Sequence, residues 1–412
     1  MQDTQLYHQI LGLSAPWCIE DVQLDIDKRC VLIFVAAQDT AVWHCPDCAR
    51  VCPLYDHREP RQWRHLDSCQ FLTYLVAALP RVRCPEHGIQ TVAVEWSDAN
   101  SRFTALFERF ALEVLHATKI QSRAAALLRL SPGQVHDLMT RAVARGLSRR
   151  DREEVLVHLS LDEKSFHKGH SYLTVLSDPT GRRVLEVVEE RTLEAVESLL
   201  ATSLTPQQRR AVRSVSMDMW PAFLSARQNV FPDADTVHDR FHVAAYLNSA
   251  VDATRRSENK TLTQSKDTTL SRTKYIWLKF PENMNDTQKM TFAALSGLEL
   301  ESAKVWAFKE NFRAFFACHT EYGARSFFER WYEAALVLGN VPLNKVAQML
   351  KRHLAGLLAY IVHRVSNGIA EGLNGQIQLL KASARGFRQF GNFRVAILFF
   401  LGKLDMYPHK SP

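Results

Sequence analysis

Hydrophobic positions along the chain change their period several times, and each change marks a candidate segment. Apolar runs rich in β-branched residues at 22–36 and 71–83 predict strands in a small N-terminal module. Residues 101–150 carry apolar positions at helical spacing. The segment 155–245 alternates strand-like runs with helical stretches, which is typical of an α/β layer, and the turn signal Asp178-Pro179-Thr180-Gly181 predicts a hairpin within it.

The last third of the chain is predicted to be helical. The strand signal disappears between about 245 and 365, where Leu, Ala, Phe, Glu, Lys and Arg recur at helical spacing, so an all-helical insertion is expected. A last helix is predicted from about residue 367, followed by a basic tail. The pattern as a whole predicts a multidomain α/β protein.

The composition narrows the class of protein and the kind of partner. With 412 residues, 46% of them hydrophobic, the chain can bury sizeable cores and is not expected to be disordered. Its 51 Lys and Arg exceed its 44 Asp and Glu by seven, which favours a polyanionic partner without identifying one. No stretch approaches the roughly 18 to 20 apolar residues of a membrane helix, and no secretory signal is evident. A cytoplasmic protein without membrane association is therefore expected.

Two short cysteine motifs predict a structural zinc site. Cys45-Pro46-Asp47-Cys48 and Cys84-Pro85-Glu86-His87 can each place two ligands on one tetrahedral ion from a tight turn. Three thiolates and one imidazole suit Zn²⁺ and leave no open position, so one structural zinc is expected on Cys45, Cys48, Cys84 and His87. The alternative is a group of ordinary buried thiols. Four residues between the motifs could replace an assigned ligand: Cys52, His57, His65 and Cys69.

A helix-turn-helix is predicted within 101–150. One helix spans Ile120 to Leu128 and a second runs from about Pro132 to Ala144, with Ser131 as its cap. Such a pair can present its second helix to the major groove of DNA. The candidates for base or phosphate contacts are Gln134, His136, Asp137, Arg141 and Arg145. A basic stretch that continues to Arg152 supports DNA binding, although a solvated linker would carry similar charge.

Two strand-like runs lead into an aspartate. Val155 to Leu161 precedes Asp162, and Val212 to Met217 precedes Asp218. An Asp at the end of a buried strand is costly to desolvate unless a cation or hydrogen bonds offset the cost, so the pair predicts a shared metal site. The alternative is that each acid caps or solvates its own element.

A third carboxylate, Glu371, lies on the predicted last helix. Steps of three and four residues place it on a polar stripe, opposite an apolar face that can pack on the α/β layer. The stripe consists of Asn367, Glu371, Asn374, Gln378, Lys381 and Arg385. Three carboxylates suit two hard divalent cations, Mg²⁺ or Mn²⁺, held roughly 3.5–4 Å apart, which activate a water or a 3′-hydroxyl in phosphodiester displacement.

Several neighbouring residues are candidates for supporting roles. Asp239 and His242 could shape the metal pocket or hold a phosphate. A purely structural role for them is an equally open alternative. Asn374 is a further candidate for the metal pocket. The residues that could bind a scissile phosphate, unless they form a solvated hairpin, are His167, Lys168 and His170. The tryptophans that could stack on an unpaired base, although core packing is favoured for each, are Trp277, Trp306 and Trp331.

Four motifs then occur in a fixed order. They are Leu161-Asp162-Glu163-Lys164-Ser165-Phe166; Ser216-Met217-Asp218-Met219-Trp220-Pro221-Ala222-Phe223; His238-Asp239-Arg240-Phe241-His242-Val243; and Ser366-Asn367-Gly368 with Glu371, Gly372 and Asn374. With the cysteine motifs and the helix-turn-helix before them, they make the chain resemble the bacterial insertion-sequence transposases of the ISL-three family over essentially its whole length. The resemblance implies a ribonuclease-H-like core with an Asp-Asp-Glu (DDE) triad at Asp162, Asp218 and Glu371.

The resemblance also implies an activity and partners. It implies a DNA transposase that binds the terminal inverted repeats of its element and catalyses metal-dependent strand cleavage and transfer, with double-stranded DNA of the element ends and the target as partner. A homodimer or higher oligomer is expected because two ends must be joined, and the expected location is the bacterial cytoplasm, on the nucleoid. Further candidates for DNA contacts lie on the last helix and the basic tail: Lys381, Arg385 and Arg388.

The implied domain order has five parts. They are a zinc-binding module (1–100), a helix-turn-helix domain (101–150), the first part of the ribonuclease-H-like core (151–245), the all-helical insertion (246–365) and the core's C-terminal helix with the basic tail (366–412). Two rival functions stay open. One is a non-catalytic zinc-finger and helix-turn-helix regulator, and the other is a nuclease with the same core but no strand transfer.

Overall fold

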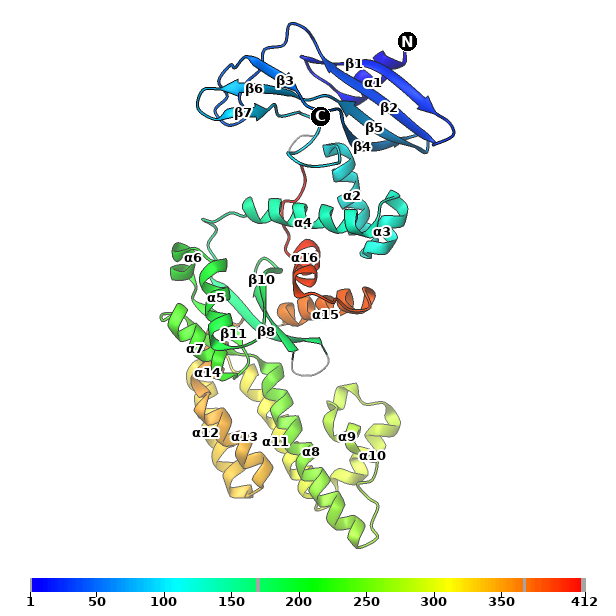
Figure 1. Cartoon of the computed structure of the whole chain (residues 1–412). Coiled ribbons are helices and arrows are strands. Elements are labelled where there is room, and N and C mark those ends of the chain that lie inside the picture. The colour runs from blue at the N-terminus through cyan, green and yellow to red at the C-terminus, as the bar shows by residue number, and fades with distance from the viewer. Residues whose placement is uncertain (1, 168–170, 366–367, 409–412) are drawn as a thin grey trace. The chain divides into compact units, whose positions relative to one another are not determined.

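The computed structural model describes residues 2–167, 171–365 and 368–408, and it divides into two compact units (Figure 1). The first unit comprises Met1–Arg150 together with Leu404–Pro412, and the second unit comprises Asp151–Lys403. Each unit contains its own buried hydrophobic cluster.

Two small sheets and helix α1 (Asp3–Leu11) form the beginning of the first unit. The strands are β1 (Trp17–Asp25), β2 (Cys30–Ala37), β3 (Leu54–His57), β4 (Arg61–Ser68), β5 (Phe71–Ala77), β6 (Pro80–Cys84) and β7 (Gly88–Thr91). One sheet has the order β1-β2-β5-β4, with only β2 and β5 parallel, and the other is an antiparallel β3-β6-β7 sheet. The apolar runs predicted at 22–36 and 71–83 each contain parts of two strands, because a short turn interrupts them.

Three helices follow in the first unit: α2 (Ala105–Thr118), α3 (Gln121–Leu128) and α4 (Pro132–Ser148). Ser131 caps α4 as predicted, since its hydroxyl accepts a hydrogen bond from the Gln134 amide at 3.2 Å. The Gln134 side chain accepts in return from the Ser131 amide at 2.9 Å, which completes a capping box. The helix continues to Ser148, beyond the predicted end at Ala144.

A five-stranded mixed sheet lies at the centre of the second unit. Its strands are β8 (His158–His167), β9 (Ser171–Asp178), β10 (Arg183–Glu189), β11 (Ser214–Met217) and β12 (Asp235–His238). In the order β10-β9-β8-β11-β12, the first three strands are antiparallel neighbours, whereas β11 runs parallel to both β8 and β12. The predicted turn at Asp178–Gly181 joins β9 to β10, which confirms the hairpin.

Helices cover this sheet on both sides (Figure 1). They are α5 (Leu193–Ser203), α6 (Pro206–Ala211), α7 (Pro221–Val230), α15 (Gly368–Ser383) and α16 (Phe390–Leu401). Leu159 and Leu161 of β8 belong to the core cluster that includes α5 and α7. Successive side chains of a strand alternate between faces, so Asp162 points to the opposite side. A hydrogen bond from Asn374 of α15 to Asp162 agrees with this direction.

One prediction about an element end was wrong, and one helix was not predicted. Asp162 lies within β8 and not at its end, because pairing with β9 continues the strand to His167. The tail predicted to be basic contains helix α16, because its residues from Phe393 to Leu401 are mostly apolar and become buried.

Residues 246–365 are all described and contain helices and no strand, as predicted. The helices are α8 (Arg240–Gln264), α9 (Lys274–Leu278), η1 (Pro281–Asn283), α10 (Asp286–Ser296), α11 (Glu301–Ala317), α12 (Glu321–Leu338), α13 (Val341–Arg352) and α14 (Leu354–His363). They share an aromatic core that includes Phe312, Phe315, Phe328 and Trp331, and α14 packs on β12. None of the helices in the described ranges combines the length and apolar character needed to cross a membrane.

Gly356 allows α14 to approach β12 closely. A Cβ atom at this position would lie 2.4 Å from Cδ2 of the His238 ring. We predict that Gly356→Ala lowers the free energy of unfolding by roughly 1–3 kcal/mol, because overpacking outweighs the gain in helix propensity. Denaturant unfolding measures the effect, with Gly391→Ala as the control, since nothing lies within 4 Å of a Cβ there. Equal stability of the two variants would contradict the prediction.

Candidate functional site

The two cysteine motifs meet in the first unit. Cys84 ends β6 and His87 directly precedes β7, while Cys45 and Cys48 lie in the loop before β3. Cys45 Sγ lies 3.7 Å from His87 Nδ1, Cys48 Sγ lies 3.7 Å from Cys84 Sγ, and Cys84 Sγ lies 3.6 Å from His87 Nδ1. Thiolates about 2.3 Å from a tetrahedral Zn²⁺ are separated by roughly 3.8 Å. The four ligand atoms therefore have the spacing that one zinc ion requires.

The Cys84 thiol of this cluster ionises more readily than an ordinary thiol. Burial opposes ionisation of the Cys84 thiol, but hydrogen bonds from the backbone amides of His87 and Glu86 and from the His87 ring outweigh it and lower its pKa to about 6. The same hydrogen bond to Cys84 raises the pKa of His87. A thiol that ionises readily is a good metal ligand.

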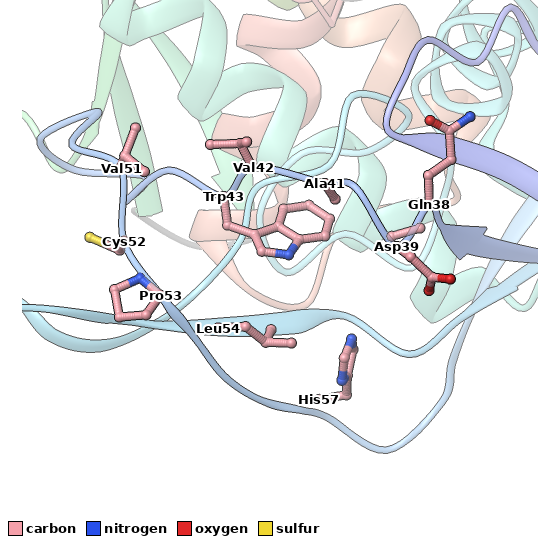
Figure 2. A pocket seen from close by; sticks show the side chains of 11 residues that line it. Gln38, Asp39, Ala41, Val42, Trp43, Val51, Cys52, Pro53, Leu54 and His57 are labelled. Carbon is pink, nitrogen blue, oxygen red and sulfur yellow. The ribbon is translucent and has the colours of Figure 1, made fainter.

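None of the four alternative ligands belongs to the compact group, although Cys52 contacts the Cys84 thiol. Cys52 and His57 line the wall of a separate pocket of about 530 Å³ with Trp43 (Figure 2). Burial, followed by contact with the Cys84 thiol, raises the pKa of Cys52, which favours its neutral form. His65 is buried with Nδ1 2.8 Å from Thr104 Oγ1, and Cys69 is exposed.

In the second unit, Asp162 is a buried carboxylate with partners from two elements. The Asn374 amide of α15 donates a hydrogen bond to Asp162 Oδ2, and Lys164 Nζ of the same strand lies 3.7 Å from this oxygen. Burial raises the pKa of Asp162 despite the favourable charge of Lys164. The arrangement fits a site where a cation offsets the desolvation of a carboxylate.

Glu371 lies one turn before Asn374 on α15. Partial burial raises its pKa, and the negative charges of Asp239 and Asp162 raise it further. Asp239 also raises the pKa of Asp162. The carboxylates of Asp162, Asp239 and Glu371 therefore influence one another's charge.

Asp218 follows β11 directly, as predicted, and is held by helix α8. His242 lies between two acids, with Nδ1 3.6 Å from Asp218 Oδ2 and Nε2 3.9 Å from Asp239 Oδ2. The Tyr246 hydroxyl donates to Asp218 Oδ1 at 3.2 Å. Burial, with the nearby charge of Asp218, raises the pKa of Tyr246 to about 12, so the phenol stays a donor.

The acids are more widely spaced than the zinc ligands. Within the described ranges, the only set of three or more His, Cys, Asp or Glu with ligand atoms all within 4.8 Å of one another is Cys45, Cys48, Cys84 and His87. The acids are connected indirectly. His242 lies between Asp218 and Asp239, Asn374 bonds Asp162, and the charges of Asp162 and Asp239 raise the pKa of Glu371.

The basic residues predicted to touch DNA differ in how free their side chains are. On α4, Arg145 donates to Glu108 at 2.6 Å and to Asp98 at 2.7 Å, whereas Arg141 lies 3.8 Å from Glu108 and His136 is half-buried. Gln134 takes part in the capping box.

In the second unit, Lys381 Nζ donates to the Ser165 carbonyl at 3.0 Å. Arg385 and Arg388 are exposed. Lys168 and His170 lie outside the described residues, as does Asn367.

One residue near the acids, Tyr246, was missed, and the favoured interpretation of the tryptophans, core packing, is confirmed for Trp277 and Trp331. Tyr246 could have been found, because Asp239, His242 and Tyr246 are spaced by three and four residues on one helix face. Trp277 and Trp331 are buried in the insertion core, with indole N–H groups bonded to Thr273 Oγ1 and the Phe308 carbonyl. They pack in the core and are not free to stack on a base.

Comparisons with known proteins agree on a family. The family model of ISL3 transposases matches residues 159–397, and a model of the zinc-finger of transposases IS204, IS1001, IS1096 and IS1165 matches residues 41–87. The chain is 26% identical to the transposase for insertion sequence element IS1557 of Mycobacterium tuberculosis, over 94% of this chain and 93% of the relative. It is also 26% identical to the IS1001 transposase of Bordetella parapertussis, over 94% and 96% of the two chains.

A solved structure, the Drosophila P element transposase strand transfer complex, aligns with 76% of this chain and 94% of its own at 10% identity and a TM-score of 0.38. A score this low does not establish a shared fold. The zinc-finger model matches the part of the chain that contains the cysteine cluster, and the transposase model matches the later part that contains the acids. The transposase model alone covers more than half of the 412 residues. The chain therefore belongs to the ISL3 family of transposases.

Proposed function

We propose that the protein is a DDE transposase that binds the terminal inverted repeats of its insertion sequence and catalyses metal-dependent strand cleavage and strand transfer. One observation carries the proposal. Asn374 bonds Asp162, which brings Glu371, one turn away on the same helix, toward the face of the sheet to which Asp162 of β8 points, beside the neighbouring strand β11 that leads into Asp218. The relatives named above are transposases of insertion sequences, which agrees with this function.

A ribonuclease-H-like core is part of the proposal. The sheet has three antiparallel strands followed by two parallel ones, and helices cover both sides. The first Asp lies on the central strand β8, the second follows β11, and Glu371 lies on a later helix. This placement is what the resemblance to the family led us to expect.

The proposed triad, Asp162, Asp218 and Glu371, would hold two Mg²⁺ or Mn²⁺ ions. When bound, such ions supply Lewis-acid stabilisation and lower the pKa of a coordinated water or 3′-hydroxyl. Tyr246 and His242 orient Asp218 by direct contact, and Asn374 orients Asp162.

DNA binding is proposed for the helix-turn-helix of α3 and α4 and for the exposed basic residues beside the acidic site. On α4 the proposed contact comes from His136, because Gln134 and Arg145 bond within the protein and Arg141 lies 3.8 Å from Glu108 with Nε and Nη2 buried. Beside the acids they come from Arg385 and Arg388, with Lys381 near β8. At least a dimer is proposed in the bacterial cytoplasm, because two element ends must be joined.

Excision of a marked element in cells tests the proposed triad. Asp162→Asn, Asp218→Asn and Glu371→Gln keep side-chain size but remove charge, so excision should fall below detection while binding to the ends persists. Asn374→Ala should lower excision by about 10- to 100-fold, the usual effect of losing a residue that orients a metal ligand. The control is Asp233→Asn, an exposed acid away from the site.

Other outcomes assign the rival functions. Wild-type protein that binds the ends and never cuts is a regulator, and one that cuts without joining ends is a nuclease. If any of the three triad variants excised the element at the wild-type level, the substituted residue would not belong to the proposed catalytic site.

Zinc content tests the proposed ligands Cys45, Cys48, Cys84 and His87. Purified wild-type protein should carry about one Zn²⁺ per chain, and Cys45→Ser should lose most of it because a closed site then lacks a ligand. Cys69→Ser is the matched control, since this thiol is exposed and separate from the cluster. Metal analysis that finds less than about half a zinc per wild-type chain, or equal zinc in Cys45→Ser, would refute the assignment.

A further inference from the structure

A second cavity lies in the second unit, on the helix that also holds Asp218. This pocket, of about 590 Å³, is lined by residues of α8, α11 and the segment before η1. Helices α8 and α11 pack against each other (Figure 1). The volume is within the range of pockets that bind a small molecule or a nucleotide-sized group, about 300–1,000 Å³.

Four phenylalanines give the pocket an aromatic lining: Phe241, Phe280, Phe312 and Phe316. Phe312 is fully buried and belongs to the core, whereas Phe241 is 40% exposed. Ring faces of this kind accept any nucleobase by stacking. An exposed ring at the edge of an aromatic pocket is therefore a suitable first contact for a base.

The cations of the pocket differ in whether their charge is already balanced. Arg313 pairs with Glu282 at 2.7 Å and with Glu310 at 3.0 Å, and Lys309 Nζ lies 3.2 Å from Glu310 Oε1. Arg240 has no acidic partner among the described residues, and its guanidinium lies 4.9 Å from the centre of the Phe241 ring. A free guanidinium beside an exposed ring favours a partner that carries both a phosphate and a flat apolar group.

A buried acceptor adds to this chemistry. Asn248 lines the pocket, and its Oδ1 is buried with no hydrogen-bond partner among the described residues. An unsatisfied buried oxygen is costly unless a ligand supplies a donor. The N–H groups on the base-pairing edge of a nucleobase are such donors.

The position of the pocket relative to the acids completes the case. Asp239, His242 and Tyr246 face the acidic site, while Phe241, Ala244 and Asn248 of the same helix line the pocket. The two sets of residues lie on opposite faces of α8, so the helix itself, about 10–12 Å across with its side chains, separates the two sites. That separation is comparable to about three nucleotide steps of a DNA strand, roughly 3.4 Å each.

We propose that this pocket receives an unpaired base of the DNA strand about three nucleotides from the cleavage site, stacked on Phe241, with Arg240 on the adjoining phosphate and Asn248 as acceptor. The proposal rests on the proposed transposase function. It differs from the tryptophan hypothesis because the stacking residue is an exposed Phe beside the acids.

Binding of two DNA duplexes tests the pocket. Both carry the end of the element, and one has a single mismatched base about three nucleotides from the cleavage position, which lowers the cost of extruding it. In full-length protein with Glu371→Gln, which should bind without cutting, the mismatched duplex should bind roughly tenfold more tightly. Phe241→Ala should abolish this preference, and Phe241→Tyr should keep it because the ring is retained.

Two further variants separate the contributions. Arg240→Ala should weaken binding of both duplexes alike, since phosphate contacts do not read base pairing. Tyr275→Ala should leave the preference unchanged. Tyr275 is 69% exposed, and the centre of its ring lies 5.7 Å from Lys274 Nζ. It therefore pairs with a cation as Phe241 does with Arg240, but it does not line the pocket.

The outcomes are distinguishable. If the protein shows no preference for the mismatched duplex, or if the preference persists in Phe241→Ala, the proposal that the pocket binds a base is wrong. A change of oligomeric state in Phe241→Ala without a change of preference also overturns it, because the occupant is then a protein surface. If the preference depends on Phe241 but wild-type protein never excises, the base pocket holds and the transposase function fails.

Discussion

A carboxylate buried within a β-strand is the constraint around which the second unit is organised. Asp162 lies in the central strand β8, and its burial is tolerable only with partners that stabilise its charge. One partner, Asn374, comes from α15, more than two hundred residues later in the chain. The helical insertion must therefore return the chain to β8, and α14 does so by packing on the edge strand β12 close to α15 in sequence.

Helix α8 holds a second acid, Asp218, as α15 holds Asp162. Its first residues hold Asp218 through His242 and Tyr246, and they also form one wall of the aromatic pocket. The four proposed zinc ligands lie on β6, beside β7 and in the loop before β3, so an ion held there would stabilise the small sheet of the first unit and leave no open position for chemistry.

The sequence was sufficient for features that depend on local pattern. The cysteine motifs, the Ser131 cap, the β9–β10 turn and the helical nature of 246–365 could be predicted because neighbouring residues determine them. The extent of β8 was missed because pairing with β9, and not local propensity, continues the strand past Asp162. The ion pair of Arg145 with Glu108 was not predictable, because Glu108 lies on another helix, distant in the sequence. The apolar α16 was overlooked because basic residues flank it.

Binding of Mn²⁺ measures most directly whether the dispersed acids form one catalytic metal site. Electron paramagnetic resonance of full-length protein on its element-end DNA should report two Mn²⁺ ions per chain, with the spin coupling of ions roughly 3.5–4 Å apart. Asp162→Asn, Asp218→Asn and Glu371→Gln should each abolish the coupled signal while zinc content is unchanged. A coupled signal that persists in these variants, or its absence in wild-type protein, would contradict a shared metal site on Asp162, Asp218 and Glu371.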